Sequence, residues 1–203
     1  MKTLEIDTPH GPAQAHVQPA AAARAALVLG HGAGGGVGSR DLVTVSEVAG
    51  EEGIRVVLVE QPYRVAGRRS PAPAHHLDAA WTAVVAHLVA GELRGLPLIV
   101  GGRSSGARVA CRTAEATGAV GVICLAFPLL PPRRSRAAPA TSRLTELEAV
   151  KVPVLIVQGA RDPFGIPPAA ERRTVVQVEG DHSLRTDPAA VADAVRAWLP
   201  GVV

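Results

Sequence analysis

Short, continuously apolar runs alternate along the chain with longer segments whose apolar positions recur at helical spacing. Runs that are apolar at every position are typical of strands buried on both faces. The alternation after residue 24 therefore predicts an α/β fold, with helices on both faces of a mostly parallel sheet. The expected strands are residues 25–29, 54–59, 98–101, 121–126, 154–158 and 174–178.

Helices are expected between these strands, and an antiparallel hairpin before them. Asp187 is a suitable N-cap for the last helix, with Pro188 in its first position. Near the N-terminus, residues 4–7 and 15–18 flank a turn-like His-Gly-Pro sequence and predict a hairpin at the sheet edge. The segments with helical period are residues 40–52, 76–93, 105–117, 141–150 and 188–199.

Two segments rich in proline and arginine, residues 63–74 and 128–140, are expected to be irregular. Both follow the carboxyl end of a predicted parallel strand. Open α/β sheets bind ligands outside the carboxyl ends of their strands, so we expect the functional site at this edge.

The composition excludes a largely disordered chain, because 47% of the 203 residues are hydrophobic and 19% are charged. No apolar run approaches the roughly 20 residues that span a bilayer, and the N-terminal segment lacks the apolar block of a secretory signal. We therefore expect one cytoplasmic domain over residues 1–203, with no membrane association. Cys111 and Cys124 lie in apolar stretches and are expected to be buried thiols rather than a disulfide.

Neither nucleic acid nor a cofactor is indicated by the charged and aromatic residues. The net charge of +3 comes from arginine, since Lys2 and Lys151 are the only lysines. Aromatic residues are scattered singly rather than interleaved with basic ones, as a nucleic-acid-binding surface would have them. No cluster of Cys, His and Asp has metal-ligand spacing. Trp81 and Trp198 fall on predicted amphipathic helices and are expected to be packing residues.

The strongest chemical motif is the pentapeptide GRSSG at residues 102–106, which has the pattern G-x-S-x-G. It lies between a predicted strand and a predicted helix, the context of a nucleophile elbow. There the turn is so tight that only glycine fits two residues before and after the nucleophile. Ser104 is therefore the candidate nucleophile, and the start of the following helix would direct N–H groups at an oxyanion.

A serine nucleophile needs a histidine base and an acid that orients it, and in this type of fold they follow in the order Ser, Asp or Glu, His. Asp162 follows the predicted strand 154–158, and His182, the only histidine after Ser104, follows the last strand. These two residues are the candidate acid and base. Asp181 is a second candidate acid, which its position next to His182 disfavours.

A glycine-rich loop, GHGAGGG at residues 30–36, has two interpretations. Its G-x-G-x-x-G spacing, with Glu60 closing the next strand, imitates a dinucleotide-binding fingerprint. Further glycines lengthen the loop before the helix, and that fingerprint leaves the serine, aspartate and histidine unexplained. In the other interpretation the loop supplies the second N–H of an oxyanion hole, from Ala33, beside the N–H of Ser105.

Together the motifs GHGAGG, EQPYRVAGRRSPAP, GGRSSGARVA, CLAFPLLPP, VQGARDPFG and GDHSL cover most of the chain. In these motifs the sequence resembles the dienelactone-hydrolase-like branch of the α/β-hydrolase superfamily, within it the small hydrolase-like family of the testis-expressed and NSL-complex-subunit type. The resemblance implies a serine-hydrolase fold with a triad of Ser104, Asp162 and His182. It implies no substrate, and some members of the family are scaffold subunits. Dienelactone hydrolases use cysteine, so their activity is not carried over.

We expect a serine hydrolase that cleaves a carboxylic ester or thioester, with a small, open site and a minimal lid. The alternative is an interaction protein that keeps the fold without turnover. Arg64 and Arg103 lie nearest the strand ends and predict a small-molecule acyl substrate that carries an anionic group. For Arg103, a structural salt bridge under the elbow is the other possibility.

Overall fold

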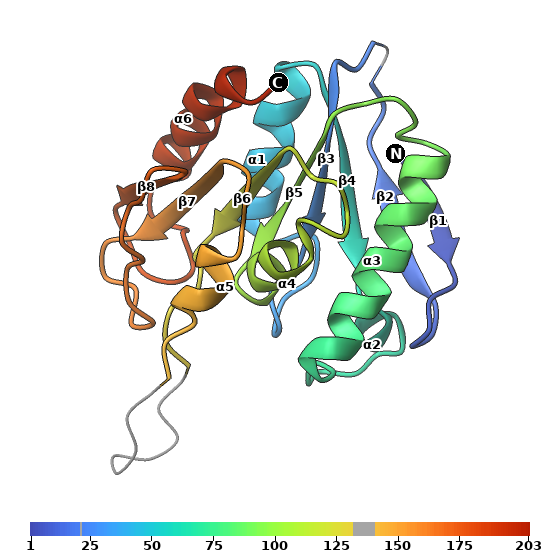
Figure 1. Cartoon of the computed structure of the whole chain (residues 1–203), viewed down its shortest axis with the longest axis horizontal. Helices are drawn as coiled ribbons and strands as arrows, with labels where there is room; N and C mark the ends of the chain where they lie inside the picture. The colour runs from blue at the N-terminus through green and yellow to red at the C-terminus, as the bar shows by residue number, and fades with distance from the viewer. Residues whose placement is uncertain (21, 132–140) are drawn as a thin grey trace.

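The computed structural model describes residues 1–20, 22–131 and 141–203. Within these residues, eight strands form one sheet with helices on both faces (Figure 1). The strand order is β1-β2-β4-β3-β5-β6-β7-β8, and every pairing from β4 onward is parallel. The predicted fold class is therefore confirmed. The strands are β1 Lys2–Ile6, β2 Ala13–Val17, β3 Ala25–Gly30, β4 Ile54–Glu60, β5 Leu98–Arg103, β6 Gly121–Leu125, β7 Val154–Gly159 and β8 Arg173–Val178.

Helices cover the sheet in two layers, with α3, α4 and α5 on one face and α1 and α6 on the other (Figure 1). Asp187 caps α6 as predicted, because its Oδ1 accepts a hydrogen bond from the N–H of Ala190 at 2.9 Å. The helices are α1 Arg40–Glu51, α2 Pro62–Val65, α3 Ala74–Ala90, α4 Ser105–Thr113, α5 Leu144–Glu148 and α6 Pro188–Trp198, with a 3₁₀ turn at Leu199–Gly201.

Three helical regions differ from the sequence prediction. α2 overlaps the start of the segment 63–74 that was expected to be irregular, and it begins one residue earlier at Pro62, whose fixed φ suits a first helical position. α4 ends at Thr113, four residues before the predicted end at 117, in a turn that Gly118 closes with a φ of 66°. α5 is only five residues long, although 141–150 was predicted.

The N-terminal hairpin forms at the edge of the sheet, as predicted. β1 and β2 pair antiparallel, with Ile6 opposite Ala13, and β2 pairs antiparallel with β4. In β2, the alanine and valine side chains are buried and the polar ones between them are half-exposed. This period of two is expected for a strand with one buried face, and it fixes the register of the hairpin.

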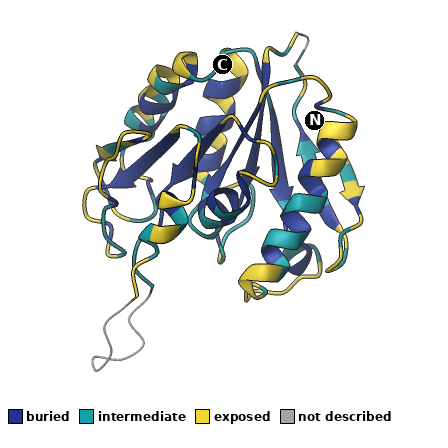
Figure 2. Ribbon diagram, in the orientation of Figure 1, coloured by how far each residue is buried: buried dark blue, intermediate teal, exposed yellow. Residues whose placement is uncertain are grey.

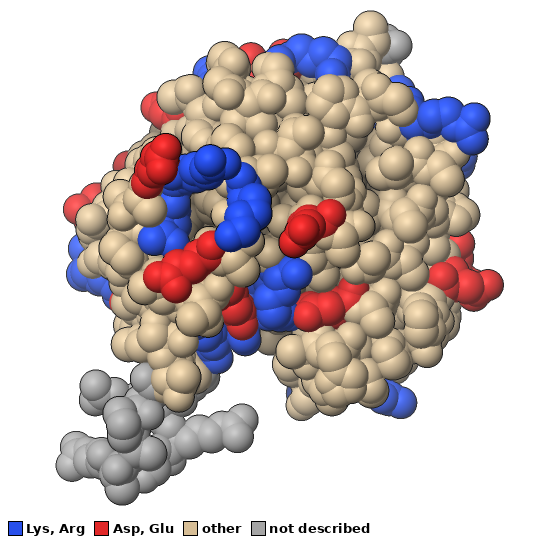
Figure 3. Space-filling view, viewed as in Figure 1, with Lys and Arg blue, Asp and Glu red and all other residues tan. Residues whose placement is uncertain are grey.

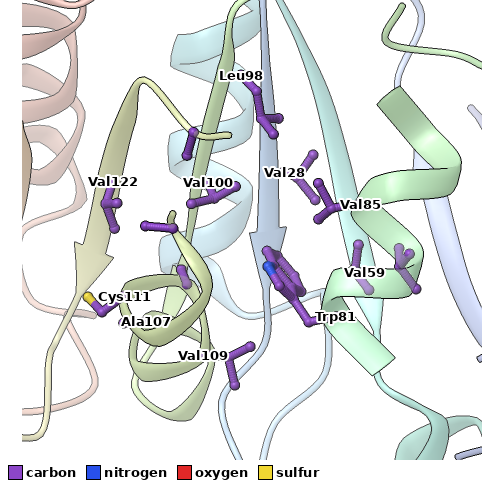
Figure 4. Close-up of a cluster of buried hydrophobic side chains, with 14 of the residues drawn as sticks. Val28, Val59, Trp81, Val85, Leu98, Val100, Ala107, Val109, Cys111 and Val122 are labelled. Atoms are coloured by element: carbon purple, nitrogen blue, oxygen red, sulfur yellow. The ribbon is translucent and has the colours of Figure 1, made fainter. Parts of the chain in front are cut away.

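The core fills both sides of the sheet, because successive side chains of the central strands point to opposite faces. In β3, Val28 packs toward α3, while Leu27 and Leu29 pack toward α1, and all three are fully buried. The central strands are buried along most of their length (Figure 2). Trp81 of α3 is 1% exposed and lies against β3 (Figure 4), which confirms its predicted packing role. Cys111 and Cys124 are free, buried thiols 3.4 Å apart, also as predicted.

The topology brings the carboxyl ends of β3, β5, β7 and β8 to one edge of the sheet. Between β6 and β7, α5 is the only helix in the described part of the chain, so no large helical lid lies there. The described residues also include no helix with the length and apolarity that crossing a membrane requires.

Candidate active site

Ser104 stands at a sharp turn between β5 and α4. Its backbone has φ 53° and ψ −105°, a region that non-glycine residues occupy at a cost of about 1–3 kcal/mol. The N–H of Ser104 donates to the carbonyl oxygen of Leu125 in β6 at 2.8 Å, which fixes the turn against the neighbouring strand. At this turn the hydroxyl of Ser104 lies within hydrogen-bond distance of His182, in the loop between β8 and α6.

Two glycines permit this turn, as the G-x-S-x-G pattern requires. A Cβ on Gly102 would lie 2.5 Å from the carbonyl oxygen of Gly30, and a Cβ on Gly106 would collide with the same oxygen. Both contacts are with backbone atoms of β3, which cannot rotate away. The close approach of α4 to β3 therefore depends on the absence of side chains at these positions.

The structure brings Ser104, His182 and Asp162 into one hydrogen-bonded chain. His182 Nε2 lies 2.9 Å from Ser104 Oγ, and His182 Nδ1 lies 2.7 Å from Asp162 Oδ2. A carboxylate only accepts hydrogen bonds, so Nδ1 carries the proton and Nε2 is free to accept the serine proton. This is the arrangement of a nucleophile, its base and the acid that orients the base.

Asp162 is buried, and each of its carboxylate oxygens has a donor. Oδ1 accepts from the N–H of Phe164 at 2.9 Å, and Oδ2 accepts from Gln158 Nε2 at 2.8 Å as well as from His182. The carboxylate of Asp181 makes no hydrogen bond to the imidazole of His182. Its Oδ1 accepts from the N–H and the hydroxyl of Ser183, and these bonds hold the pKa of the exposed Asp181 below its usual range.

Gln158, at the end of β7, was not predicted as a site residue. Besides Asp162, its amide nitrogen lies 3.1 Å from the carbonyl oxygen of Phe127 and 3.0 Å from that of Gly165. It thereby joins the carboxyl end of β6 to the loop that carries Asp162. A single glutamine closing an otherwise apolar strand is the sequence signal that could have identified it.

His31 orients the peptide that carries the candidate oxyanion donor. Its Nδ1 lies 2.9 Å from the carbonyl oxygen of Gly32, and its Nε2 accepts from the N–H of Gln61 at 3.1 Å. The second contact leaves the proton on Nδ1, so Nδ1 donates to Gly32. The Gly32–Ala33 peptide is trans, so its N–H points away from that carbonyl. Burial, the largest influence, lowers the pKa of His31 and keeps the imidazole neutral.

One further contact and the start of α4 support the proposed oxyanion hole. The hydroxyl of Tyr63 donates to the carbonyl oxygen of Ala33 at 3.1 Å and ties the glycine-rich loop to α2. Ser105 is the first residue of α4, where backbone N–H groups have no partner within the helix. The residues proposed as donors, Ala33 and Ser105, thus belong to a loop held by side-chain contacts and to a helix start.

The two arginines predicted to bind substrate differ in their surroundings. The guanidinium of Arg103 donates to the main-chain carbonyl of His182 at 3.0 Å and faces Asp41 Oδ2 at 3.4 Å. Arg64 lies in α2, and its positive charge contributes to the lowered pKa of His31, after the larger effect of burial. The contacts of Arg103 favour the salt bridge that the sequence left open. Three further arginines of the segment 128–140, namely Arg133, Arg134 and Arg136, lie outside the described residues.

Other arginines pair with acidic side chains on the face that carries α3, α4 and α5, where both signs of charge are interspersed (Figure 3). Arg108 of α4 forms a two-point ion pair with Glu146 of α5, at 2.9 and 2.5 Å. Arg112 similarly contacts Asp78 of α3 at 2.8 and 2.6 Å. These pairs bridge helices on the face of the sheet and do not contact the triad. In the described part of the chain, no three His, Cys, Asp or Glu residues are arranged to hold a metal ion.

Comparison with known proteins places the chain in a family and agrees with its fold. Residues 23–193 match the alpha/beta hydrolase domain, so the chain belongs to the alpha/beta hydrolase domain family. No curated protein sequence matches it. The narrower resemblance to the testis-expressed and NSL-complex-subunit type stays a prediction.

Solved structures share the fold at low sequence identity. XC6422 from Xanthomonas campestris, a serine hydrolase without a lid, is 21% identical with a TM-score of 0.74, covering 98% of this chain and 95% of that one. Est1E from Butyrivibrio proteoclasticus is 17% identical with a TM-score of 0.77, covering 98% of both chains. The esterase Pf2001 from Pyrococcus furiosus is 16% identical with a TM-score of 0.78, covering 98% and 89%.

Proposed function

We propose that the protein is a serine hydrolase that cleaves a carboxylic ester or thioester through an acyl-enzyme intermediate. The observation that carries this proposal is the hydrogen-bonded chain from Ser104 through His182 to Asp162, built on a strained strand-to-helix turn. Such strain persists where the surrounding structure enforces it and is concentrated at functional sites. Membership of the alpha/beta hydrolase domain family supports the same interpretation.

In the acylation step, His182 Nε2 takes the proton of Ser104 as Oγ attacks the acyl carbonyl carbon. The carbonyl oxygen becomes an oxyanion, which accepts hydrogen bonds from the N–H groups of Ser105 and Ala33. The tetrahedral intermediate then collapses and breaks the bond to the alcohol or thiol, which leaves with the proton from His182. Asp162 stabilises the imidazolium and holds its orientation throughout, without itself taking the proton.

Deacylation repeats the same steps with water as the nucleophile. His182 removes a proton from water, the hydroxide oxygen attacks the acyl-serine carbonyl, and the same two N–H groups hold the oxyanion. Collapse releases the carboxylic acid and returns the proton through His182 to Ser104 Oγ. The enzyme is then ready for another substrate, and the net reaction consumes one water molecule.

The proposed substrate is a short, soluble acyl compound that carries an anionic group. The short α5 between β6 and β7 supports an open site. A cavity of about 390 Å³ adjoins α2, and Tyr63, which contacts the oxyanion loop, lines it together with Arg68. Arg64 lies on the same short helix. This placement supports a role for Arg64 in attracting an anionic part of the substrate.

Hydrolysis of p-nitrophenyl acetate by the wild type and by Ser104→Ala tests the proposal. We expect measurable turnover by the wild type and loss of several orders of magnitude in the variant, because removal of a triad member leaves only residual catalysis. Equal rates would refute the assignment of Ser104. A wild type with no activity on any acyl ester or thioester would favour the alternative, an interaction protein that keeps the fold.

A further inference from the structure

Arg103 is the residue immediately before the proposed nucleophile, and its side chain contacts three separate parts of the site. One guanidinium nitrogen, Nη2, donates to the main-chain carbonyl of His182. The side chain also lies directly against Gly32 of the oxyanion loop, where a Cβ would be 2.9 Å from Nη1 and 3.1 Å from Cδ. Nε faces the carboxylate of Asp41 at 3.4 Å. Every guanidinium nitrogen therefore has a protein group beside it.

Asp41 anchors this arrangement from the first turn of α1. Its side chain is 1% exposed, and Oδ1 accepts from the N–H of Leu42 at 3.0 Å. Within the described residues, Oδ2 makes no hydrogen bond, and the guanidinium of Arg103 at 3.4 Å is its counterion. A buried carboxylate without a counterion is strongly unfavourable, so the pair holds the guanidinium in a fixed place. Because the guanidinium of Arg103 is paired with Asp41, it is not free to bind an anionic substrate.

Arg103 connects the backbone of the nucleophile, Ser104, to the backbone of the base, His182. His182 has to reach Ser104 and Asp162 at the same time, and its main chain lies in the loop between β8 and α6. Arg103 is covalently joined to Ser104 and hydrogen-bonded to the carbonyl of His182. One side chain thus sets the separation between the backbone of the nucleophile and that of the base. Misplacement by about 1 Å can lower the rate by about 100-fold.

We infer that Arg103, anchored by Asp41, is a positioning residue that holds His182 and the oxyanion loop in register with Ser104, and that it does not bind the substrate. The inference rests on the proposed function, because it assumes that Ser104 and His182 react. It replaces the substrate-binding role that the sequence suggested for Arg103, while Arg64 keeps the role proposed above.

The test compares Arg103→Met with a matched control, Arg108→Met. Both changes remove a partly buried guanidinium and its ion pair, with side-chain exposures of 20% for Arg103 and 24% for Arg108, but Arg108 pairs with Glu146 away from the triad. The substrates are a neutral ester, p-nitrophenyl acetate, and a carboxylate-bearing one, the p-nitrophenyl monoester of succinic acid. Thermal melting confirms that each variant is folded.

A positioning role predicts that Arg103→Met lowers kcat by about 10- to 100-fold on both esters, with KM nearly unchanged. Arg108→Met should keep kcat within about threefold of the wild type. Arg103→Lys should recover part of kcat, since an ammonium can still reach one of the two partners. Asp41→Asn keeps the acceptor for Leu42 and loses the anchoring charge, so it should lower kcat in the same direction.

Two results would overturn the inference. A rise in KM confined to the carboxylate-bearing ester would make Arg103 a substrate-binding residue, and an unchanged kcat in Arg103→Met would show that it positions nothing. If Arg103→Met does not fold, an unchanged kcat in Asp41→Asn has the same meaning. A wild type that hydrolyses neither ester and is not labelled at Ser104 by a fluorophosphonate contradicts the proposed function itself.

Discussion

The position of the Ala33 N–H is expected to depend on one nitrogen of the His31 ring, which provides a specific test of the oxyanion hole. Asparagine can place its amide nitrogen where Nδ1 of histidine lies, and glutamine can place its amide oxygen where Nε2 lies. His31→Asn should therefore keep the hydrogen bond to the carbonyl of Gly32 and lose the one from Gln61. His31→Gln should do the reverse.

The expected loss of activity follows from the peptide geometry. Without the contact from His31, the carbonyl of Gly32 keeps, among the described residues, only the 3.2 Å hydrogen bond from the N–H of Gly35. The Gly32–Ala33 peptide is then held less firmly, and the Ala33 N–H points less steadily at the oxyanion. Complete loss of one oxyanion donor costs about 10²- to 10³-fold in kcat, so misorientation should cost about 10- to 100-fold. His31→Gln should show this loss in steady-state hydrolysis of p-nitrophenyl acetate. His31→Asn should stay within about fivefold of the wild type.

Both variants should be less stable than the wild type, because each removes one buried hydrogen bond. His31→Asn takes the acceptor from the N–H of Gln61, and His31→Gln leaves the carbonyl of Gly32 with the N–H of Gly35 as its single donor in the described part of the chain. An unsatisfied buried group costs about 1–3 kcal/mol in the free energy of unfolding, measurable by urea titration. If the two variants had equal kcat, or if the asparagine variant were the slower one, the orientation of Ala33 by His31 would be refuted.

The pH dependence of the free energy of unfolding tests whether the imidazole of His31 is neutral in the folded protein. Burial lowers its pKa from 6.5 in the folded protein, so below about pH 6.5 the unfolded chain binds a proton that the folded chain does not. The stabilisation is present above that pH and is lost as the pH falls toward the lowered value. The stability advantage of the wild type over His31→Asn should therefore be smaller at about pH 5 than at about pH 8. An advantage that grew on acidification would contradict the neutral, buried imidazole.

Three other changes test the remaining parts of the site. Asp162→Asn should lower kcat by about 10⁴-fold in ester hydrolysis with little change in melting temperature, since it favours the wrong tautomer of His182; wild-type activity would exclude Asp162 as the acid. Gly106→Ala should destabilise the protein by about 1–3 kcal/mol in urea unfolding and lower kcat, because the methyl group meets the backbone of Gly30. The control Gly50→Ala should do neither, since a Cβ at that position has no neighbour within 4 Å. Equal effects of the two changes would contradict the close contact of α4 with β3. The open site predicts faster hydrolysis of a soluble short-chain ester than of emulsified long-chain triglyceride, and the reverse preference would contradict it.

The fold could be predicted from the sequence because its central strands are buried on both faces. Residues 98–101 are apolar at every position, and so are residues 154–157, a pattern typical of strands in the middle of a covered sheet. The short α2 was missed, because its proline and arginine content indicated a loop and four residues carry no helical period. Prediction from periodicity succeeded for strands whose burial imposes a pattern, and it failed for a helix that is too short to show a repeating pattern.

The residues of the triad could be proposed from the sequence because each follows a strand in the order that the elbow requires. The residues that support them could not. Asp41 contacts Arg103, Gln158 contacts the carbonyl of Phe127, and His31 contacts the N–H of Gln61. The two partners of each contact lie far apart in the sequence, so these contacts exist only after the chain has folded. Arg103 shows the same limit, since its position beside Ser104 indicated a substrate contact, whereas its guanidinium faces His182 and Asp41.

Labelling with a fluorophosphonate probe tests the central claim most directly, because the probe reports an activated serine without knowledge of the substrate. We expect stoichiometric labelling of the wild type, mapped by peptide mass spectrometry to Ser104. We also expect no labelling in Ser104→Ala and greatly slowed labelling when His182 is replaced by alanine. A folded wild type that is not labelled, or one that is labelled at a different serine, would contradict it.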